Sequence, residues 1–258
     1  MTPNSNITVI SAINDHLVSE ANLLCSPLLR RDDVQFIPAE GFDSASRAYN
    51  YGLMKATGEL LIFAHQDVYI PDSWHQQMLS AIAMAENMPH PWAVLGVVGV
   101  NGSQGAAKGC SWSTGLAREV GLPVDQPVPA VSLDELILVV RKSSGLLFDK
   151  NLPGWHLYGT DIVQAALTQG LGAYIIHAPV IHNSLPVMRL DAGFSECYRY
   201  LCRKWCRRLP IQTCCIRLTR FGWPLIKKRI RQLFVSTDRN VFLRLADPAA
   251  KARKLGYE

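Results

Sequence analysis

The chain has 258 residues, of which 48% are hydrophobic, so it is long and apolar enough for one large domain or one domain with an appendage. Its net charge is +5, and the basic character is concentrated between 199 and 231, where 11 Lys or Arg and no Asp or Glu occur. The apolar run at 92–100 is too short to cross a bilayer and the N-terminus lacks a signal-peptide pattern, so we expect a cytoplasmic protein.

Seven cysteines are present, and five of them lie between Cys197 and Cys215 without a Cys-x-x-Cys pair. In a reducing compartment the simplest interpretation is free thiols, some of them buried. A zinc site is the alternative, although the spacing matches no common ligand pattern.

The first predicted strand covers 6–13, a segment rich in β-branched residues, and the polar pair Asn14-Asp15 follows it. We expect a helix over 19–29 and a second short strand over 34–38, with Glu40 just beyond. Polar residues at strand ends either cap turns or bind ligands, and both interpretations stay open here.

The stretch 44–71 has the clearest pattern of the chain. Its first part alternates apolar and polar residues at helical spacing, and 60–64 is an uninterrupted apolar run of strand length. Such a run suits a parallel strand that is covered on both faces. The run ends abruptly at His65-Gln66-Asp67. Because open α/β sheets bind ligands at the carboxyl ends of their strands, this tripeptide is a candidate site.

This stretch resembles the nucleotide-sugar glycosyltransferases of the GT-A fold, of the inverting family-two type. In that family an A-x-N-x-G-x-x-x-A-x-G-E segment leads into an apolar strand ending in an Asp-x-Asp motif, and the matching residues here are Ala48, Asn50, Gly52, Ala56, Gly58 and Glu59. In this chain His65 replaces the first Asp of that motif, and the resulting His-Gln-Asp sequence is similar to the form found in a bacterial branch of the superfamily. The resemblance covers about 7–205 and implies an α/β fold: a GT-A, Rossmann-like, mostly parallel sheet flanked by helices.

The resemblance implies a nucleoside diphosphate sugar as donor, for which we expect a UDP-sugar. In the family the end of the first strand contacts the base and ribose, and the residue after the second strand faces the base. Arg47 lies in the first turn of the predicted helix, where a cation opposes the macrodipole, so it suits a phosphate-facing role. The residues expected at the nucleotide are Ala12, Asn14, Glu40, Arg47, His65 and Gln66.

The resemblance also implies a divalent metal. Asp67 matches the retained carboxylate of the strand-end motif, and His182 matches the metal-binding histidine after the last strand, with His177 as a competing candidate. Together with the diphosphate these side chains would hold Mn²⁺ or Mg²⁺, and the imidazole favours Mn²⁺.

Two carboxylates, Asp134 and Glu135, interrupt the otherwise apolar strand predicted over 128–141. Carboxylates inside such a strand are costly unless they have partners or a function, so we expect Asp134 to contact a donor or acceptor sugar.

The segment 148–161, FDKNLPGWHLYGTD, resembles the part of the family that holds the catalytic base. The resemblance implies that Asp161 takes the proton of the acceptor hydroxyl. An Asp at a helix start is equally suited to an N-cap. A sugar-stacking wall, for which core packing is the alternative, is expected from Trp155, His156 and Tyr158.

We divide the chain into a GT-A domain, residues 1–184, and a basic, amphipathic helical segment, residues 185–258. A helix is expected over 194–205. Between 216 and 234 basic residues alternate with aromatic and aliphatic ones. This pattern favours peripheral binding to an anionic membrane, with a solvated helix packed on the domain as the alternative.

The sequence therefore predicts a metal-dependent inverting glycosyltransferase that moves a sugar from a nucleoside diphosphate sugar to a hydroxyl acceptor. We expect a glycan or lipid-linked acceptor in cell-surface polysaccharide synthesis, a location at the inner membrane surface, and no nucleic-acid partner. One alternative is a non-catalytic nucleotide-sugar-binding module of the same fold, which the His65 substitution keeps open. Another is a different nucleotide-dependent transferase, although 7–15 lacks the glycine- and lysine-rich signature of a nucleotidyltransferase.

Overall fold

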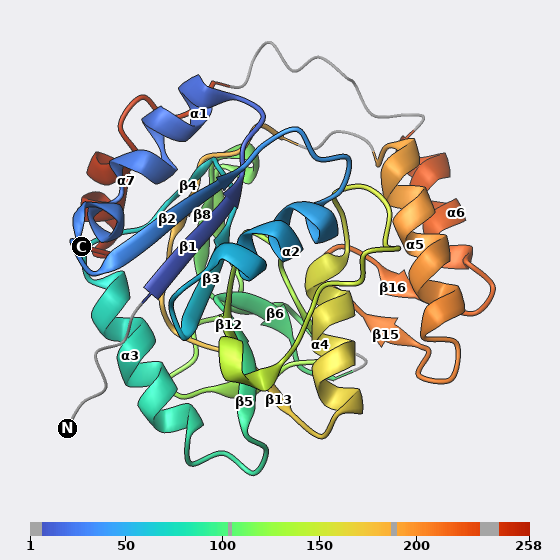
Figure 1. The fold of residues 1–258 in the computed structure, drawn as a ribbon. Helices are drawn as coiled ribbons and strands as arrows, with labels where there is room; N and C mark the ends of the chain where they lie inside the picture. Colours follow the sequence, from blue (N-terminus) through green and yellow to red (C-terminus); the bar gives the residue numbers. More distant parts are fainter. Residues whose placement is uncertain (1–6, 103–104, 187–189, 233–242) are drawn as a thin grey trace.

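A computed structural model describes residues 7–102, 105–186, 190–232 and 243–258. Its centre is a seven-stranded sheet (Figure 1). In spatial order the strands are β10 (Val128–Pro129), β13 (Gly172–Ile175), β5 (Trp92–Gly96), β12 (Ile137–Arg141), β3 (Leu60–Ala64), β1 (Ile7–Ala12) and β2 (Val34–Ala39). All of them run in one direction except β10 and β12, which are antiparallel to their neighbours. The predicted α/β class with a mostly parallel sheet flanked by helices is confirmed.

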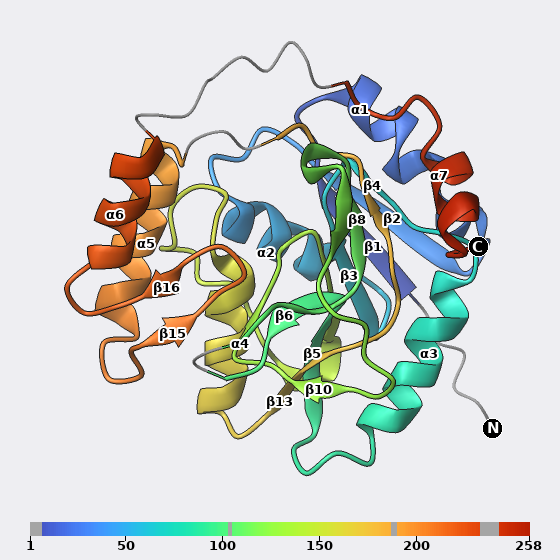
Figure 2. The same cartoon turned by 180° about the vertical axis from the view of Figure 1, so that it is seen from behind.

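Helices cover both faces of this sheet (Figures 1 and 2). The α-helices are α1 (His16–Ala21), α2 (Ala45–Lys55), α3 (Trp74–Ala85), α4 (Tyr158–Thr168), α5 (Ala192–Lys204), α6 (Trp223–Gln232) and α7 (Pro248–Leu255). Short 3₁₀ turns are η1 (Leu23–Cys25), η2 (Pro27–Arg30), η3 (Thr114–Leu116) and η4 (Lys142–Ser144). Side chains of α2, α4 and α5 pack on one face of the sheet, and those of α3 pack on the other.

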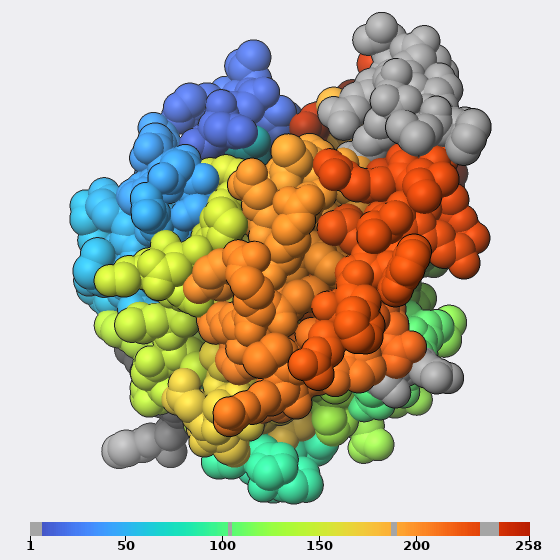
Figure 3. Space-filling view, turned by 90° about the vertical axis from the view of Figure 1, so that its right-hand side faces the viewer, coloured from blue at the N-terminus to red at the C-terminus, as the bar shows by residue number. Residues whose placement is uncertain are grey.

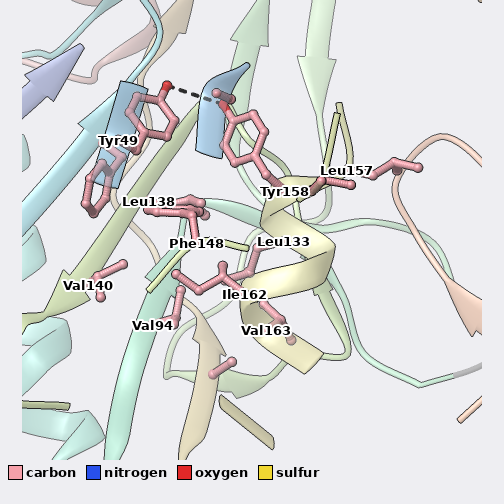
Figure 4. Close-up of a cluster of buried hydrophobic side chains, with 14 of the residues drawn as sticks. Tyr49, Val94, Leu133, Leu138, Val140, Phe148, Leu157, Tyr158, Ile162 and Val163 are labelled. Carbon is pink, nitrogen blue, oxygen red and sulfur yellow. Dashed lines mark hydrogen bonds between the residues drawn. The ribbon is translucent and has the colours of Figure 1, made fainter. Parts of the chain in front are cut away.

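The strand β3 shows why the sheet is covered twice. Leu61 and Phe63 enter the core beneath α2 and α4, whereas Ile62 enters the core beneath α3. This alternation follows from the two-residue period of a strand, so an unbroken apolar run supplies both cores. Figure 4 shows the α4 side of the first core, where Tyr49 and Phe148 lie among aliphatic side chains.

The predicted helix over 19–29 is wrong in extent. The helix α1 ends at Ala21, and Asn22 leaves the helical conformation while its side-chain amide donates to the Val18 carbonyl oxygen. Because Asn competes in this way for backbone groups and Pro27 has no N–H to donate, the chain continues as η1 and η2 instead.

The predicted strand over 128–141 is divided into three strands, which lie in two different sheets. Its parts are β10, β11 (Ser132–Leu133) and β12, so the two carboxylates lie in a connection between strands rather than inside one. A three-stranded sheet contains β11, β6 (Val98–Val100) and β7 (Lys108–Gly109). A four-stranded sheet contains β4 (Val68–Tyr69), β14 (Ile181–His182), β8 (Ser111–Ser113) and β9 (Arg118–Val120).

The segment after residue 184 shares the core of the sheet rather than standing apart from it. Phe194, Tyr198 and Leu201 of α5 belong to the same buried cluster as α2 and α4. The segment also contains a hairpin, β15 (Ile211–Gln212) with β16 (Arg217–Leu218), which sequence reasoning did not anticipate. Figure 3 shows this segment, in orange, covering one side of the molecule. The division at residue 184 stays a prediction.

Among the residues that the structure describes, none of the helices is both long enough and apolar enough to span a membrane.

Candidate functional site

The site is built at the carboxyl end of β3. The backbone N–H of His65 donates to the carbonyl oxygen of Leu136 (3.0 Å), which extends the pairing of β3 with β12 by one residue. The chain then turns, and β4 leaves the main sheet for the four-stranded one. Because the strand direction changes here, the side chains of His65 and Asp67 lie where two sheets diverge.

The histidine His182 reaches the same place from the far end of the chain. The strand β14 is antiparallel to β4, with His182 opposite Val68. The N–H of Asn183 donates to the carbonyl oxygen of Asp67 (2.8 Å), which fixes this register. Nε2 of His182 lies 3.3 Å from Oδ1 of Asp67. Two predicted metal ligands that are far apart in sequence are therefore neighbours.

Three side chains at this point could hold a metal ion. His65, Asp67 and His182 each offer one ligand atom, and these atoms lie within 4.8 Å of one another. The rings of His65 and His182 are 5.7 Å apart, centroid to centroid. Two imidazoles and one carboxylate suit Mn²⁺ better than Mg²⁺, which prefers oxygen ligands. Sequence reasoning assigned His65 to the nucleotide, and the structure places it with the metal candidates.

The tautomer of His65 is set by Tyr158. Nε2 of His65 lies 2.7 Å from the Tyr158 hydroxyl, which donates its own proton to the carbonyl oxygen of Glu135 (3.2 Å). The hydroxyl must then accept from His65, so the imidazole proton lies on Nε2 and Nδ1 keeps a free lone pair. Burial lowers the pKa of His65 and favours this neutral form. Such a partner on the other ring nitrogen is typical of metal-binding histidines.

The charges around Asp67 keep it ionised. Burial alone would raise the pKa of Asp67, but His182, His65 and Arg244 together hold it well below its usual range. Burial alone would lower the pKa of His182, but the negative charge of Asp67 outweighs burial and raises that pKa. A carboxylate that stays charged in a half-buried position is a ready cation ligand.

Sequence reasoning missed Arg244. Its Nη1 donates to Oδ2 of Asp67 (3.1 Å) and to the carbonyl oxygen of Asn183 (2.5 Å). The fully buried side chain of Asn183 accepts from the N–H of Leu245 (2.7 Å) and donates to its carbonyl oxygen (3.0 Å). The C-terminal segment thereby brings a guanidinium group to the proposed metal ligand. No local motif marks this arginine, so only the tertiary structure reveals it.

Two of the residues predicted at the nucleotide are joined directly. Oε1 of Gln66 accepts from the N–H groups of Asn14 (2.9 Å) and Asp15 (3.1 Å), and its amide donates to Oδ1 of Asn14 (2.6 Å). These bonds tie the end of β3 to the end of β1. Ala12, the last residue of β1, is half-buried beside them.

The other two predicted nucleotide residues are exposed. Glu40 lies 3.7 Å from His16, and Arg47 pairs with Asp43 (2.8 Å) four residues before it. The Arg47 guanidinium is therefore already balanced by a carboxylate in this structure.

The residues predicted at the sugar lie around α4. Trp155 is 42% exposed, and His156 lies 3.6 Å from Oδ1 of Asp191. Tyr158, in contrast, is buried in the core and contacts Tyr49, so its stacking face is not available. Figure 4 shows the pair of tyrosines, joined by a dashed line. Asp134 is half-buried, and its Oδ1 accepts from the N–H of Leu136 (3.2 Å).

Asp161 is 3% exposed and both of its oxygens have partners. Oδ1 accepts from Nε1 of Trp205 (2.7 Å), and Oδ2 accepts from Nζ of Lys204 (2.8 Å). The same lysine pairs with Asp149 (2.7 Å). Burial raises the pKa of Asp161 despite the lysine, which opposes the rise. The structure thus places Asp161 between α4 and α5, in a polar network that joins the two helices.

Comparison with known proteins gives distant similarities. A search against protein families finds no match to this chain. A curated protein from Fuscovulum blasticum, described as ATP synthase subunits region ORF 6, is 29% identical over 164 residues, which are 61% of this chain and 64% of that protein. The match thus spans less than two thirds of that relative.

Among solved structures, GalNAc-T7 with UDP, GalNAc and Mn²⁺ aligns with a TM-score of 0.45 and 13% identity over 90% of this chain and 55% of that one. Residues 1–349 of TarS from S. aureus in complex with UDP-GlcNAc align with a TM-score of 0.46 and 14% sequence identity, over 80% of this chain and 67% of that one. The mannosyltransferase PcManGT from Pyrobaculum calidifontis in complex with GDP-Man and Mn²⁺ aligns with a TM-score of 0.46 and 11% sequence identity, over 77% of this chain and 60% of that one. Alignments at these TM-scores assign no function to this chain.

Proposed function

We propose that this protein is a metal-dependent glycosyltransferase of the GT-A type, which transfers a sugar from a nucleoside diphosphate sugar to a hydroxyl group with inversion. The observation that carries the proposal is the grouping of His65, Asp67 and His182, with ligand atoms within 4.8 Å of one another at the end of β3. Open α/β sheets bind ligands at this edge, and the motif around β3 resembles that of these transferases.

The three side chains fit a divalent cation, and Mn²⁺ better than Mg²⁺. When bound, the metal would supply charge neutralisation for the departing diphosphate. The protein's own contribution is to keep Asp67 ionised through His182 and to hold the His65 ring through Tyr158. Both contacts orient the ligands before any cation arrives.

We propose that the donor nucleotide lies along the ends of β1 and β3. The Gln66–Asn14 hydrogen bonds support this, because they fix two polar side chains beside the metal candidates. Ala12, Glu40 and Arg47 complete the proposed nucleotide site, with a UDP-sugar as the expected donor. Arg47 would exchange its surface partner Asp43 for a phosphate group.

We propose that the acceptor approaches from the α4 side, where Trp155, His156 and Asp134 are accessible at least in part. The sequence assigns the role of proton acceptor to Asp161, and that assignment stays a prediction. A glycan or lipid-linked acceptor in cell-surface polysaccharide synthesis is the proposed substrate class.

The helix α6 supports the proposal that the protein binds an anionic membrane. Only Leu225 of this helix is buried, whereas Trp223 is 68% and the adjoining Phe221 77% exposed. Ile226 and Ile230 are exposed as well, and the basic residues beside them are Lys227, Lys228, Arg229 and Arg231. Exposed aromatic and basic residues on one helix suit the interface of a negatively charged bilayer.

One observation favours a second function, a module that binds a nucleotide sugar without transferring it. The Arg244 guanidinium already neutralises Asp67, as a bound cation would. In such a module the arginine would serve the diphosphate in place of a metal, and binding would not depend on a divalent ion.

A thermal-shift experiment separates the two functions. UDP at about 100 times its dissociation constant stabilises a protein that binds it only when folded by about 2.7 kcal/mol. The transferase requires that UDP raises the Tm with Mn²⁺ present and not with EDTA. An equal rise under both conditions would support the metal-independent module instead.

A further inference from the structure

The helix α4 begins at a crowded place that only glycine can occupy. A Cβ atom built on Gly159 would lie 2.6 Å from the carbonyl oxygen of Leu133 and 3.1 Å from Cγ of Glu135. The missing side chain at this position therefore leaves room for the side chain of Glu135 against the first turn of the helix. The first N–H groups of a helix have no helical acceptor, so a carboxylate there finds donors.

The residue before α4 has an unusual backbone. Leu157 is buried and has φ of 64°, in the left-handed region that L-residues rarely adopt. The N–H groups of Leu157 and Gly159 both favour the charged form of Glu135. Strained backbone of this kind concentrates at functional sites, where it holds a group in place.

Glu135 lies at the same edge of the sheet as the metal candidates. Its carbonyl oxygen accepts from the Tyr158 hydroxyl, which contacts Nε2 of His65. The next residue, Leu136, accepts from the N–H of His65. One contact to Glu135 and one to Leu136 thus hold this stretch of backbone beside the proposed donor site.

The other carboxylates near this edge are already engaged. Asp161 is bound by Lys204 and Trp205, and Asp67 by His182 and Arg244. Asp134 caps its own turn through the N–H of Leu136. Glu135 is half-buried and forms no ion pair within the described part of the chain. Neutral N–H groups rather than a cation face its carboxyl group, which can therefore take up a proton.

We propose that Glu135 is the catalytic residue that accepts the proton of the attacking hydroxyl group. The proposal rests on the function proposed above. As the acceptor oxygen bonds to the anomeric carbon, its proton passes to a carboxylate oxygen of Glu135. The bond from that carbon to the diphosphate oxygen breaks, and its electron pair stays on the nucleoside diphosphate.

The environment of Glu135 is consistent with this role. Burial and the nearby charge of Asp134 raise the pKa of Glu135 to about 8, although the N–H groups of Gly159 and Leu157 oppose the rise. A general base works best when its pKa lies near the working pH, because it is then both available and strong enough.

The test compares Glu135→Gln with Glu196→Gln, the same substitution at an exposed position of α5. Release of the nucleoside diphosphate is measured with Mn²⁺ and water as acceptor: UDP from UDP-glucose, UDP-galactose and UDP-GlcNAc in turn, and GDP from GDP-mannose. We expect Glu135→Gln to slow the release about a hundredfold to ten-thousandfold, as loss of a general base does, and Glu196→Gln to match the wild type. UDP affinity, measured by calorimetry with Mn²⁺, is expected to stay unchanged in both.

A Glu135→Gln protein that releases UDP at the wild-type rate would overturn the role of Glu135 while leaving the transferase intact. A loss of rate that is accompanied by an equal loss of UDP affinity would also overturn it, because the residue would then serve binding. A wild-type protein that releases UDP or GDP from none of the donors would instead refute the transferase, and the role of Glu135 with it.

Discussion

Arg244 and Asp67 form an ion pair across 177 residues of sequence, with Nη1 of the arginine 3.1 Å from Oδ2 of the carboxylate. The other oxygen of Asp67 faces His182. A cation bound by His65, Asp67 and His182 would therefore share the Asp67 carboxylate with the Arg244 guanidinium, which already binds one of its two oxygens. The arginine and the metal compete for one group, unless a diphosphate draws the arginine away.

The first prediction follows from this competition. Arg244→Ala should strengthen the binding of Mn²⁺ alone by about fivefold, because a partly exposed ion pair contributes about 1 kcal/mol. Arg253→Ala, which removes an exposed arginine paired loosely with Asp247 (3.8 Å), is the control and should leave Mn²⁺ binding unchanged. Calorimetry with Mn²⁺ measures both. Weaker Mn²⁺ binding by Arg244→Ala would show that the arginine supports the site rather than competing for it.

The second prediction concerns stability and pH. The pKa of Glu135 is raised in the folded protein to about 8, above its unfolded value of about 4.3. Between these two values the folded state keeps a proton that the unfolded state has lost, so the contribution of Glu135 to stability falls as pH rises. Glu135→Gln removes the titration. Its Tm should therefore exceed the wild-type Tm by more at pH 8 than at pH 5.

Other titratable groups surround Glu135 in both proteins, and burial raises the pKa of the tyrosines and cysteines among them, so these stay protonated at pH 5 and at pH 8. The surrounding groups come from several elements and are Asp134, Tyr49, Tyr158, Cys197, Cys214 and Cys215. Differential scanning calorimetry at the two pH values gives the answer. If the Tm difference between Glu135→Gln and the wild type is the same at both pH values, or larger at pH 5, Glu135 does not keep its proton in the folded protein.

The third prediction concerns Asp161. Asp161→Asn keeps an acceptor for Trp205 but removes the charge that faces Lys204, so the network between α4 and α5 loses a charged hydrogen bond. We expect a loss of about 1–3 kcal/mol in the free energy of unfolding. Asp33→Asn, which breaks the exposed pair with Arg31, should change it by less than about 1 kcal/mol. Unchanged stability together with lost UDP release would return the role of base to Asp161.

The fourth prediction concerns α6. Trp223→Ser should weaken binding to vesicles that contain anionic lipid, and added salt should weaken wild-type binding further because it screens the basic residues beside the tryptophan. Leu17→Ser is the control, since Leu17 is 77% exposed on α1, away from this helix. Vesicle sedimentation measures the bound fraction. Equal binding by the wild type and Trp223→Ser would refute the membrane interface.

Much of the fold could be predicted because β3 is an unbroken apolar run and its flanking helices have clear periodicity. Because the apolar run ends sharply at Ala64, the positions of His65 and Asp67 at the end of this strand could be predicted as well. The pairing of β14 with β4, which brings His182 to Asp67, involves two-residue strands that have no periodic signal. His182 could be predicted only from its order in the family pattern.

The parts of the site that sequence reasoning missed depend on long-range contacts. Arg244 is one arginine in a basic C-terminal segment, and nothing nearby in sequence indicates that Asn183 anchors its neighbour Leu245. The sequence shows Glu135 next to Asp134, but it does not show that Gly159, 24 residues later, leaves the space for the Glu135 side chain. Asp161 illustrates the opposite case, since its helix-start position could be predicted and its burial against Lys204 could not.

The most direct test of the account is the calorimetric titration of UDP into the wild-type protein and Asp67→Asn, each with Mn²⁺ and with EDTA. The isosteric change keeps the shape of the side chain and removes the charge that the cation needs. We predict that the wild type binds UDP with Mn²⁺, and that EDTA or Asp67→Asn weakens binding by about a hundredfold, as the loss of metal-site groups does. Circular dichroism should show both proteins folded. UDP binding that is equal with EDTA and in Asp67→Asn would contradict a metal-dependent nucleotide-sugar site at the end of β3.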